Sequence, residues 1–215
     1  MQEPTYLNPY SDIEKLRNRL PHWEQDNCTY FITQRLHDSL PMSLLAEWKA
    51  EKTVWEERNP QPWNPAQEKA YHQLFSHRKE QLLDRGLGGC ILRQSKTRKV
   101  VQQVWFFGSP NAHIWCGVIM PNHIHLLASL LSGVSLSTVM KSWKGKSARL
   151  TNQARGATGP FWAKDYYDRL IRNSRHFRSC ASYIRANPLK AKLKQDDYSV
   201  VESEYVKRLL DDTAN

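Results

Sequence analysis

The sequence has few cysteines, fewer acidic than basic residues and no long uncharged apolar run. Its four cysteines, Cys28, Cys90, Cys116 and Cys180, are spaced neither like a zinc ribbon nor like a dense disulfide framework. No apolar run approaches the roughly 18 residues that a membrane helix needs, and the first residues do not form a basic stretch followed by an apolar one. These absences argue against a membrane protein and against export, so we expect a protein of the reducing cytoplasm.

The composition is that of a folded, basic protein. The chain has 215 residues, of which 40% are hydrophobic and 24% are charged, enough apolar material for a real core. We therefore expect one domain over 1–215, with its core at about 28–195. The 31 Lys and Arg against 21 Asp and Glu give a net charge of +10, which favours a polyanionic partner, either a nucleic acid or an anionic membrane surface.

The positive charge is concentrated between Lys141 and Lys194. This segment contains fourteen Lys or Arg and only two acids, Asp165 and Asp168, whereas the rest of the chain is slightly negative. A solvated basic face would explain the charge alone, but interleaved aromatic residues are typical of a surface that pairs with phosphates and stacks on bases, although some of these rings must belong to the core. The candidate DNA-binding residues are Lys141, Lys144, Lys146, Arg149, Trp162, Tyr167, Arg169, Arg172, Arg175, Arg178 and Arg185.

The amino-terminal part is expected to form a helix and then a strand. Residues 11–20 have the pattern of a short helix, with Ser11 as its N-cap and Pro21 at its end. Aromatic and β-branched residues at about 28–36 favour the first strand of the core.

A helical insertion is expected after this strand. Residues 42–57 and 66–84 have helical patterns, and glycines stop the second helix. The stretch at about 42–90 is therefore predicted to be an addition to the core. Ser95 or Thr97 can cap a further amphipathic helix beyond it.

A hairpin with two histidines occupies the centre of the chain. Residues 114–120 are nearly all apolar, as in a strand buried on both faces, and a Pro-Asn turn separates them from the alternating residues 123–130. Because side chains alternate along a strand, His123 and His125 project from the same face.

Two helices are predicted after the hairpin. One is capped by Ser135 and runs to about residue 152, and the other is capped by Ser174 and runs to Asn187, where Pro188 disfavours a helical conformation of the residue before it. Residues 161–170 between them are expected to be irregular or a short strand.

Four side chains of this half could form a metal-dependent site. His123 and His125 can share one metal ion, although most His-x-His pairs do not bind metal. Tyr183 and Asn187 lie four residues apart on one line of the second helix, at the edge of its apolar stripe. By itself this helix would be read differently, with the tyrosine as a packing residue and the asparagine as a C-terminal cap.

These residues carry a resemblance to a known family. The segment MPNHIHLL at 120–127 resembles the histidine–hydrophobe–histidine (HUH) motif of single-tyrosine transposases. Together with FW at 161–162, YDRLIR at 167–172 and YIRANPLK at 183–190, it is similar to the REP-associated tyrosine transposases in particular. The similarity covers about residues 28–195 and is strongest from 112 to 193.

The resemblance implies a fold, a cofactor and a role for each residue. The fold is α+β, with a ferredoxin-like βαββαβ antiparallel sheet covered by helices. His123 and His125 would bind Mg²⁺ or Mn²⁺, Asn187 would be the third ligand, and Tyr183 would be the nucleophile. The implied activity is metal-dependent cleavage and rejoining of single-stranded DNA beside hairpins such as REP-like palindromes, through a 5′-phosphotyrosine, by a nucleoid-associated monomer or homodimer.

Other interpretations remain open at this point. The same chemistry would serve a replication initiator or a relaxase, and the histidines could be relics in a non-catalytic nucleic-acid-binding module. Tyr166 and Tyr167 are rival nucleophiles by composition, although neither shares a helical line with a ligand residue.

Overall fold

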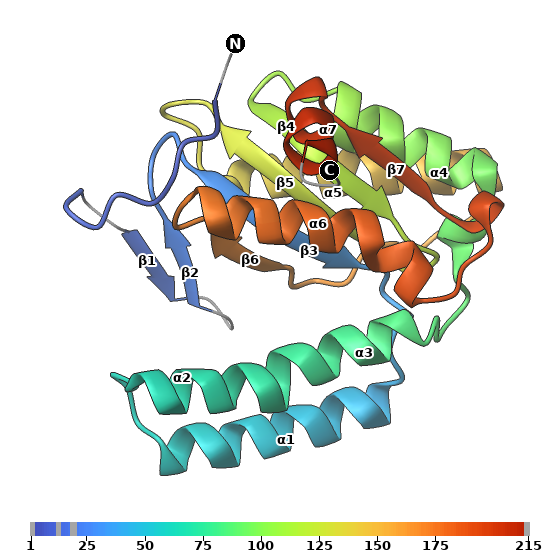
Figure 1. The fold of residues 1–215 in the computed structure, drawn as a ribbon. Coiled ribbons are helices and arrows are strands. Elements are labelled where there is room, and N and C mark those ends of the chain that lie inside the picture. The colour runs from blue at the N-terminus through green and yellow to red at the C-terminus, as the bar shows by residue number, and fades with distance from the viewer. Residues whose placement is uncertain (1–2, 12–13, 18–20, 213–215) are drawn as a thin grey trace.

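The computed structural model describes residues 3–11, 14–17 and 21–212 (Figure 1). The amino-terminal part corrects one prediction, because β1 (Glu14–Arg17) and β2 (Pro21–Glu24) form an antiparallel hairpin where a helix over 11–20 was expected. The remaining residues of that expected helix, 12–13 and 18–20, lie outside the described residues. A four-residue strand shows too little periodicity to be distinguished from a helical turn, and Pro21 starts a strand where it was expected to end a helix.

A five-stranded antiparallel sheet forms the core, in the order β6-β3-β5-β4-β7. Strands β3, β4, β5 and β6, in chain order, have the β6-β3-β5-β4 arrangement of a ferredoxin-like βαββαβ fold, so the predicted fold class is confirmed. The fifth strand, β7, extends the sheet beside β4, and it comes from the carboxy-terminal tail, for which no role was predicted. The strands are β3 (Thr29–Arg35), β4 (Ala112–Ile119), β5 (His123–Leu130), β6 (Tyr167–Leu170) and β7 (Ser199–Glu202).

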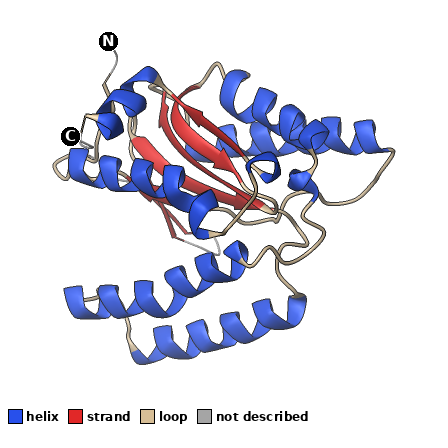
Figure 2. Ribbon diagram, turned by 45° about the vertical axis from the view of Figure 1, so that its right-hand side comes forward, coloured by secondary structure: helices blue, strands red, loops and turns tan. Residues whose placement is uncertain are grey.

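Helices cover both faces of the sheet (Figures 1 and 2). Helices α4 (Ser95–Gln102) and α5 (Leu136–Arg155) pack on one face, and α6 (Ser174–Lys190) and α7 (Glu204–Asp211) pack on the other. Along β5, Leu126 contributes to the first core and Leu127 to the second, as the alternation of the sequence predicts. His123 and His125 therefore face α6. Short helices complete the chain: η2 (Ile91–Arg93), the π-helical η3 (Gln103–Phe107) and η4 (Gln195–Asp197).

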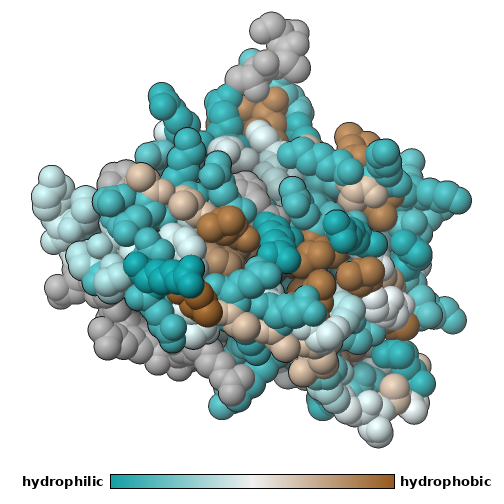
Figure 3. Space-filling view, turned by 90° about the horizontal axis from the view of Figure 1, so that it is seen from below, coloured by the Kyte–Doolittle hydropathy of each residue, from teal (hydrophilic) through white to brown (hydrophobic). Residues whose placement is uncertain are grey.

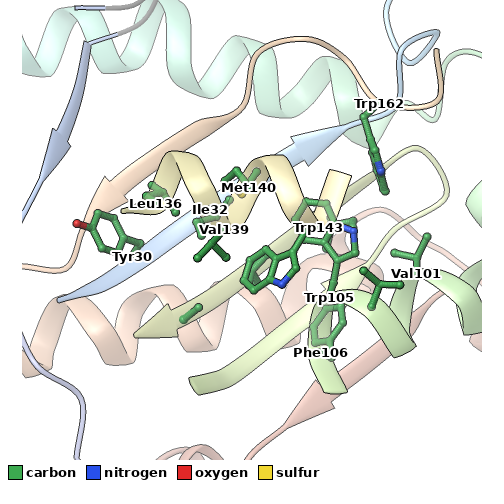
Figure 4. Packing of buried hydrophobic residues seen from close by; sticks show 14 of the residues in the cluster. Tyr30, Ile32, Val101, Trp105, Phe106, Leu136, Val139, Met140, Trp143 and Trp162 are labelled. Atoms are coloured by element: carbon green, nitrogen blue, oxygen red, sulfur yellow. The ribbon is translucent and has the colours of Figure 1, made fainter. Parts of the chain in front are cut away.

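Trp105, Trp143 and Trp162 belong to the aromatic core between the sheet and α5 (Figure 4). The Ser147 hydroxyl accepts hydrogen bonds from the indole N–H groups of Trp105 at 3.0 Å and Trp162 at 2.9 Å, and donates to the backbone carbonyl of Trp143 at 2.6 Å. All four residues are buried. A single small hydroxyl thus allows two large rings to pack with their indole N–H groups satisfied.

The predicted insertion is a helical hairpin that projects from one edge of the sheet (Figure 1). Helix α1 (Met42–Arg58) packs against a second rod made of α2 (Pro65–Tyr71), the π-helical η1 (His72–His77) and α3 (Arg78–Asp84). Trp55 of α1 contacts the rings of Trp63, Tyr71 and Phe75. Figure 3 views the molecule from this side, where small hydrophobic areas are separated by hydrophilic side chains.

Helix α6 begins and continues differently from the prediction. Its N-cap is Asn173, whose side-chain oxygen accepts a hydrogen bond from the backbone N–H of His176 at 2.9 Å, so Ser174 is the first helical residue. The helix also continues through Pro188 to Lys190. Proline removes only its own N–H donor, and the Asn187 carbonyl still accepts from the N–H of Ala191 at 3.0 Å.

The serine bridge predicts a specific loss of stability. Ser147→Ala would leave two buried indole N–H groups without their acceptor, so the free energy of unfolding should fall by about 2–4 kcal/mol. Ser142→Ala on the exposed side of the same helix serves as the control and should change it by less than about 0.5 kcal/mol. Urea denaturation followed by tryptophan fluorescence measures both. Equal stability of the two variants would contradict the role of the bridge.

Candidate active site

Strand β5 brings its two histidines into direct contact. The Nε2 atoms of His123 and His125 are 3.0 Å apart, and both residues are only 1% exposed. The Nδ1 atom of His123 lies 2.7 Å from Oδ1 of Asn122, and that of His125 lies 2.8 Å from Oγ1 of Thr33 on the neighbouring strand. Phe31 stacks on the His125 ring with a centroid separation of 5.4 Å. Each imidazole is therefore held at its Nδ1 atom, while its Nε2 atom faces the other histidine.

Burial keeps this pair of imidazoles uncharged. It lowers the pKa of His123 to about 3 and also lowers the pKa of His125, which the neighbouring His123 lowers further. A charged imidazole would lose its hydration in this site, and this loss is the main cause of both shifts. Neutral imidazoles offer nitrogen lone pairs, which is the state that a metal ion requires.

Helix α6 places the tyrosine against the histidine pair and the asparagine beside the tyrosine. The Tyr183 hydroxyl lies 3.5 Å from Nε2 of His125, and the two rings meet edge to face at 5.3 Å. Asn187, one turn further along, is 1% exposed, and its Oδ1 accepts no hydrogen bond from the described residues. The helix is anchored by its stripe of Phe177, Ala181 and Ile184, all fully buried. Tyr183 thus contacts the histidine pair, and Asn187 is hydrogen-bonded to Tyr183.

The insertion contributes a residue that sequence reasoning missed. Asp84, the last residue of α3, has its Oδ1 atom 4.0 Å from Nε2 of His123, and this buried oxygen accepts no hydrogen bond from the described residues. Burial raises the pKa of Asp84, and the charge of Lys190 opposes that rise. No spacing rule connects an aspartate in a surface insertion with a histidine 39 positions later, so only the folded chain reveals their proximity.

The Tyr183 hydroxyl is held in its protonated form. Burial is the main cause that raises its pKa, and the charges of Glu80 and Asp84 on α3 raise it further, whereas a hydrogen bond with Asn187 lowers it. The ammonium group of Lys190 lies 5.4 Å from the centre of the Tyr183 ring. A phenol in this environment becomes a nucleophile only when added positive charge compensates the oxygen.

The donor set fits a divalent cation. The 3.0 Å between the two Nε2 atoms equals the separation of neighbouring ligands around an octahedral ion with metal–ligand distances of about 2.1 Å. Among the described residues no three His, Cys, Asp or Glu side chains are placed to hold a metal ion, so the site would need the amide oxygen of Asn187. That oxygen is buried without a donor, which is costly unless a cation or water satisfies it.

Tyr166 and Tyr167, the two alternative nucleophiles, are placed less favourably than Tyr183. Tyr166 packs against the core on the α4 and α5 side of the sheet, away from the histidines. Tyr167 packs on the α6 side, and burial raises its pKa to about 12, but no contact between its hydroxyl and either histidine is seen in the described part of the chain.

The predicted DNA-binding residues do not form one surface. Trp162 is buried with its indole N–H bonded to Ser147, so its ring is not available to a base. Arg185 forms a bidentate ion pair with Glu202 and a further pair with Asp211, which commits it to joining α6 to the carboxy-terminal segment. Tyr167 is half-buried.

The cations of this set lie in two different layers of the molecule. On α5, Lys141, Lys146 and Arg149 are exposed, and Lys144 donates to the backbone carbonyl of Lys164. The exposed or half-exposed arginines Arg169, Arg172, Arg175 and Arg178 belong to β6, α6 and the turn between them.

Comparisons with known proteins identify similarities for much of the chain. Residues 96–187 match the model of the family described as Transposase IS200 like, a region that contains both histidines, Tyr183 and Asn187. No curated protein sequence matches the chain. Within the described residues, no helix is long and apolar enough to cross a membrane.

Two solved structures are similar to the chain. A REP-associated tyrosine transposase bound to a REP hairpin has 18% identity and a TM-score of 0.44, over 81% of this chain and 74% of that chain. A transposase-like protein from Deinococcus radiodurans R1 has 15% identity and a TM-score of 0.31, over 87% of this chain and 98% of that chain.

The two arginines of α6 that differ in pairing should behave differently. Arg185→Gln breaks the ion pair with the largely buried Glu202 and should lower the free energy of unfolding by about 1–2 kcal/mol. Arg175→Gln on the exposed side should leave the stability unchanged. Thermal melts measure both variants, and equal stabilities would contradict the structural role of Arg185.

Proposed function

We propose that the protein is a REP-associated tyrosine transposase, because residues 96–187 match the model of the IS200-like transposase family and the sequence motifs resemble those of that group. It cleaves and rejoins single-stranded DNA beside hairpins such as REP-like palindromes, and it works on the bacterial chromosome in the nucleoid. The observation that carries the proposal is the contact between the Tyr183 hydroxyl and the buried histidine pair. The resemblance of the motifs supplies the hairpin as the substrate.

The chemistry follows from what the four side chains can do. Tyr183 attacks the scissile phosphorus, the bond to the 3′-oxygen breaks, and the phenolic proton is balanced by the proton that the released 3′-hydroxyl gains. The product is a 5′-phosphotyrosyl strand, which preserves the energy of the broken bond for rejoining. His123, His125 and Asn187 would hold Mg²⁺ or Mn²⁺. The bound ion supplies polarisation of the phosphate and neutralises the charge that develops on it.

Uncharged ligands suit this substrate. Two neutral imidazoles and an amide leave the full charge of the cation to act on the phosphate, whereas carboxylate ligands would cancel part of it. Lys190, 5.4 Å from the centre of the Tyr183 ring, adds a positive group beside the nucleophile. The sequence motifs include this lysine without indicating its position over the ring.

The site must open to accept DNA. Both histidines are 1% exposed, and Tyr183 is packed against them from above. A phosphate can reach the pair only when Tyr183 and the end of α3, which carries Asp84, move aside. We therefore expect hairpin binding to precede assembly of the reactive arrangement.

The first test of this proposal concerns the nucleophile. Tyr183→Phe removes one oxygen and keeps the ring contacts with Phe31 and His125, so the melting temperature should hardly change. A labelled hairpin oligonucleotide incubated with Mn²⁺ should give a denaturation-resistant adduct with the wild type and none with the variant. Tyr167→Phe is the matched control and should retain the adduct.

Other outcomes of this experiment have definite meanings. An adduct that persists in Tyr183→Phe would move the nucleophile to another tyrosine, and mass spectrometry of the DNA-linked peptide would identify it. Gel retardation of the hairpin without any wild-type adduct would support the non-catalytic binding module instead.

The second test locates the DNA. With about five phosphate contacts, the slope of log K against log salt should be roughly −3.5 to −4.5. If the hairpin lies on the side of α6, Arg175→Gln should reduce the magnitude of the slope by roughly 0.7–0.9, and Lys146→Gln on α5 should leave it unchanged. Equal effects of both variants, measured by fluorescence anisotropy, would show that DNA contacts both layers.

A further inference from the structure

Two polar residues that take no part in the proposed reaction contact the histidine pair. Asn122, in the turn before β5, is fully buried, and Thr33 on β3 is buried beside His125. Each contacts one Nδ1 atom, on the side of the ring opposite the shared Nε2 edge. The partners of these two residues determine where the imidazole protons lie.

The orientation of the Asn122 amide follows from its partners. Its Nδ2 atom lies 3.1 Å from the backbone carbonyls of both Leu83 and Leu87. Carbonyl oxygens only accept hydrogen bonds, so the amide nitrogen must face them and Oδ1 must face His123. Since Oδ1 also only accepts, Nδ1 of His123 carries a proton. The neutral ring of His123 therefore has a bare Nε2 atom.

The state of His125 follows from that of His123. Their Nε2 atoms are 3.0 Å apart, a separation that suits two ligands of one ion and, without an ion, a hydrogen bond with one proton between them. Because Nε2 of His123 is bare, Nε2 of His125 is the donor. The neutral ring of His125 then has a bare Nδ1 atom, which accepts a hydrogen bond from the Thr33 hydroxyl at 2.8 Å.

This arrangement cannot bind a cation without a change. Both Nε2 atoms must offer lone pairs to an ion, so the proton on His125 must leave Nε2 and Nδ1 must gain one, with no change in total charge. A hydroxyl both donates and accepts, so Thr33 can bond to Nδ1 in either state. The amide oxygen of Asn122 accepts only, which allows no such change for His123.

We propose that Asn122 and Thr33 are complementary positioning residues of the cation site: Asn122 holds His123 in the Nδ1–H tautomer, and Thr33 lets His125 change from the Nε2–H to the Nδ1–H tautomer when a cation binds. The inference rests on the proposed function in that the pair binds a divalent ion. The same two bonds to Leu83 and Leu87 attach the end of the helical insertion to the turn before His123. The insertion and the first ligand are thereby positioned by one side chain.

The tautomers can be observed directly in the whole protein. Nitrogen-15 NMR of histidine-labelled protein distinguishes the protonated nitrogen of each neutral ring. Without metal, His123 should be protonated at Nδ1 and His125 at Nε2, and saturating Mg²⁺ should move only the His125 proton. A metal-free His123 protonated at Nε2, or a His125 that keeps its Nε2 proton with Mg²⁺ bound, would overturn the proposal whether or not the protein cleaves DNA.

Substitution of the threonine tests its part by affinity. Thr33→Val keeps the shape and removes the hydroxyl, so the Kd for Mn²⁺, measured by electron paramagnetic resonance, should rise by about tenfold or more. Thr33→Ser should bind as the wild type does. Thr29→Val is the matched control, because it removes another buried hydroxyl of β3, the one bonded to Ser129 at 2.7 Å, without touching either histidine.

Substitution of the asparagine separates its two roles. Asn122→Asp keeps the acceptor for His123 but loses both donors to the insertion, so Mn²⁺ affinity should survive while hydrogen exchange at residues 83–89 accelerates. Equal Mn²⁺ affinities of Thr33→Val and Thr29→Val would overturn the role of Thr33 alone. A wild-type protein without Mn²⁺ affinity would overturn the metal dependence of the proposed function together with this inference, whereas loss of the DNA adduct alone would leave the inference standing.

Discussion

The burial of two imidazoles between the sheet and α6 is the constraint on which the rest of the site depends. Solvent is excluded from His123 and His125, so the rings stay neutral and keep their nitrogen lone pairs. The same burial raises the pKa of Tyr183, so that its hydroxyl stays protonated. It also leaves the amide oxygen of Asn187 without a hydrogen-bond donor among the described residues. Each of these groups is unfavourable alone, and a divalent ion with a bound phosphate would satisfy all of them at once.

The two layers of the molecule differ in composition. Between the sheet and α5, the indole N–H groups of Trp105 and Trp162 are bonded to Ser147 within a dense aromatic core. On the α6 side, the Oδ1 atoms of Asp84 and Asn187 are buried and have no hydrogen-bond partner among the described residues. Exceptions of this kind concentrate at functional sites in proteins.

The helical insertion and the carboxy-terminal segment both contact the elements that form the site. The turn that carries Asn122 is bonded to the insertion, and Asp84, the last residue of its helix α3, lies beside His123. The carboxy-terminal segment adds a strand to the sheet and holds α6 through the ion pair between Arg185 and Glu202. Both additions therefore act on the elements that carry the ligands and the tyrosine.

Local patterns in the sequence are sufficient to predict the strands of the hairpin, the common face of His123 and His125, and the common line of Tyr183 and Asn187. These features depend on the periods of strand and helix, which are local properties of the chain. The amino-terminal hairpin was misread as a helix, because a strand of four residues has too short a period to be recognised and its partner is another short strand.

Which charged and aromatic residues are exposed and which are buried or paired depends on the tertiary structure. Trp162 and Arg185 belong by composition to a DNA-binding segment, yet one is bonded to Ser147 and the other to Glu202. The approach of Asp84 to His123 and the contacts of Asn122 and Thr33 were equally invisible. They join elements far apart in the chain, and their partners depend on how the sheet, the helices and the insertion pack, which no local pattern encodes.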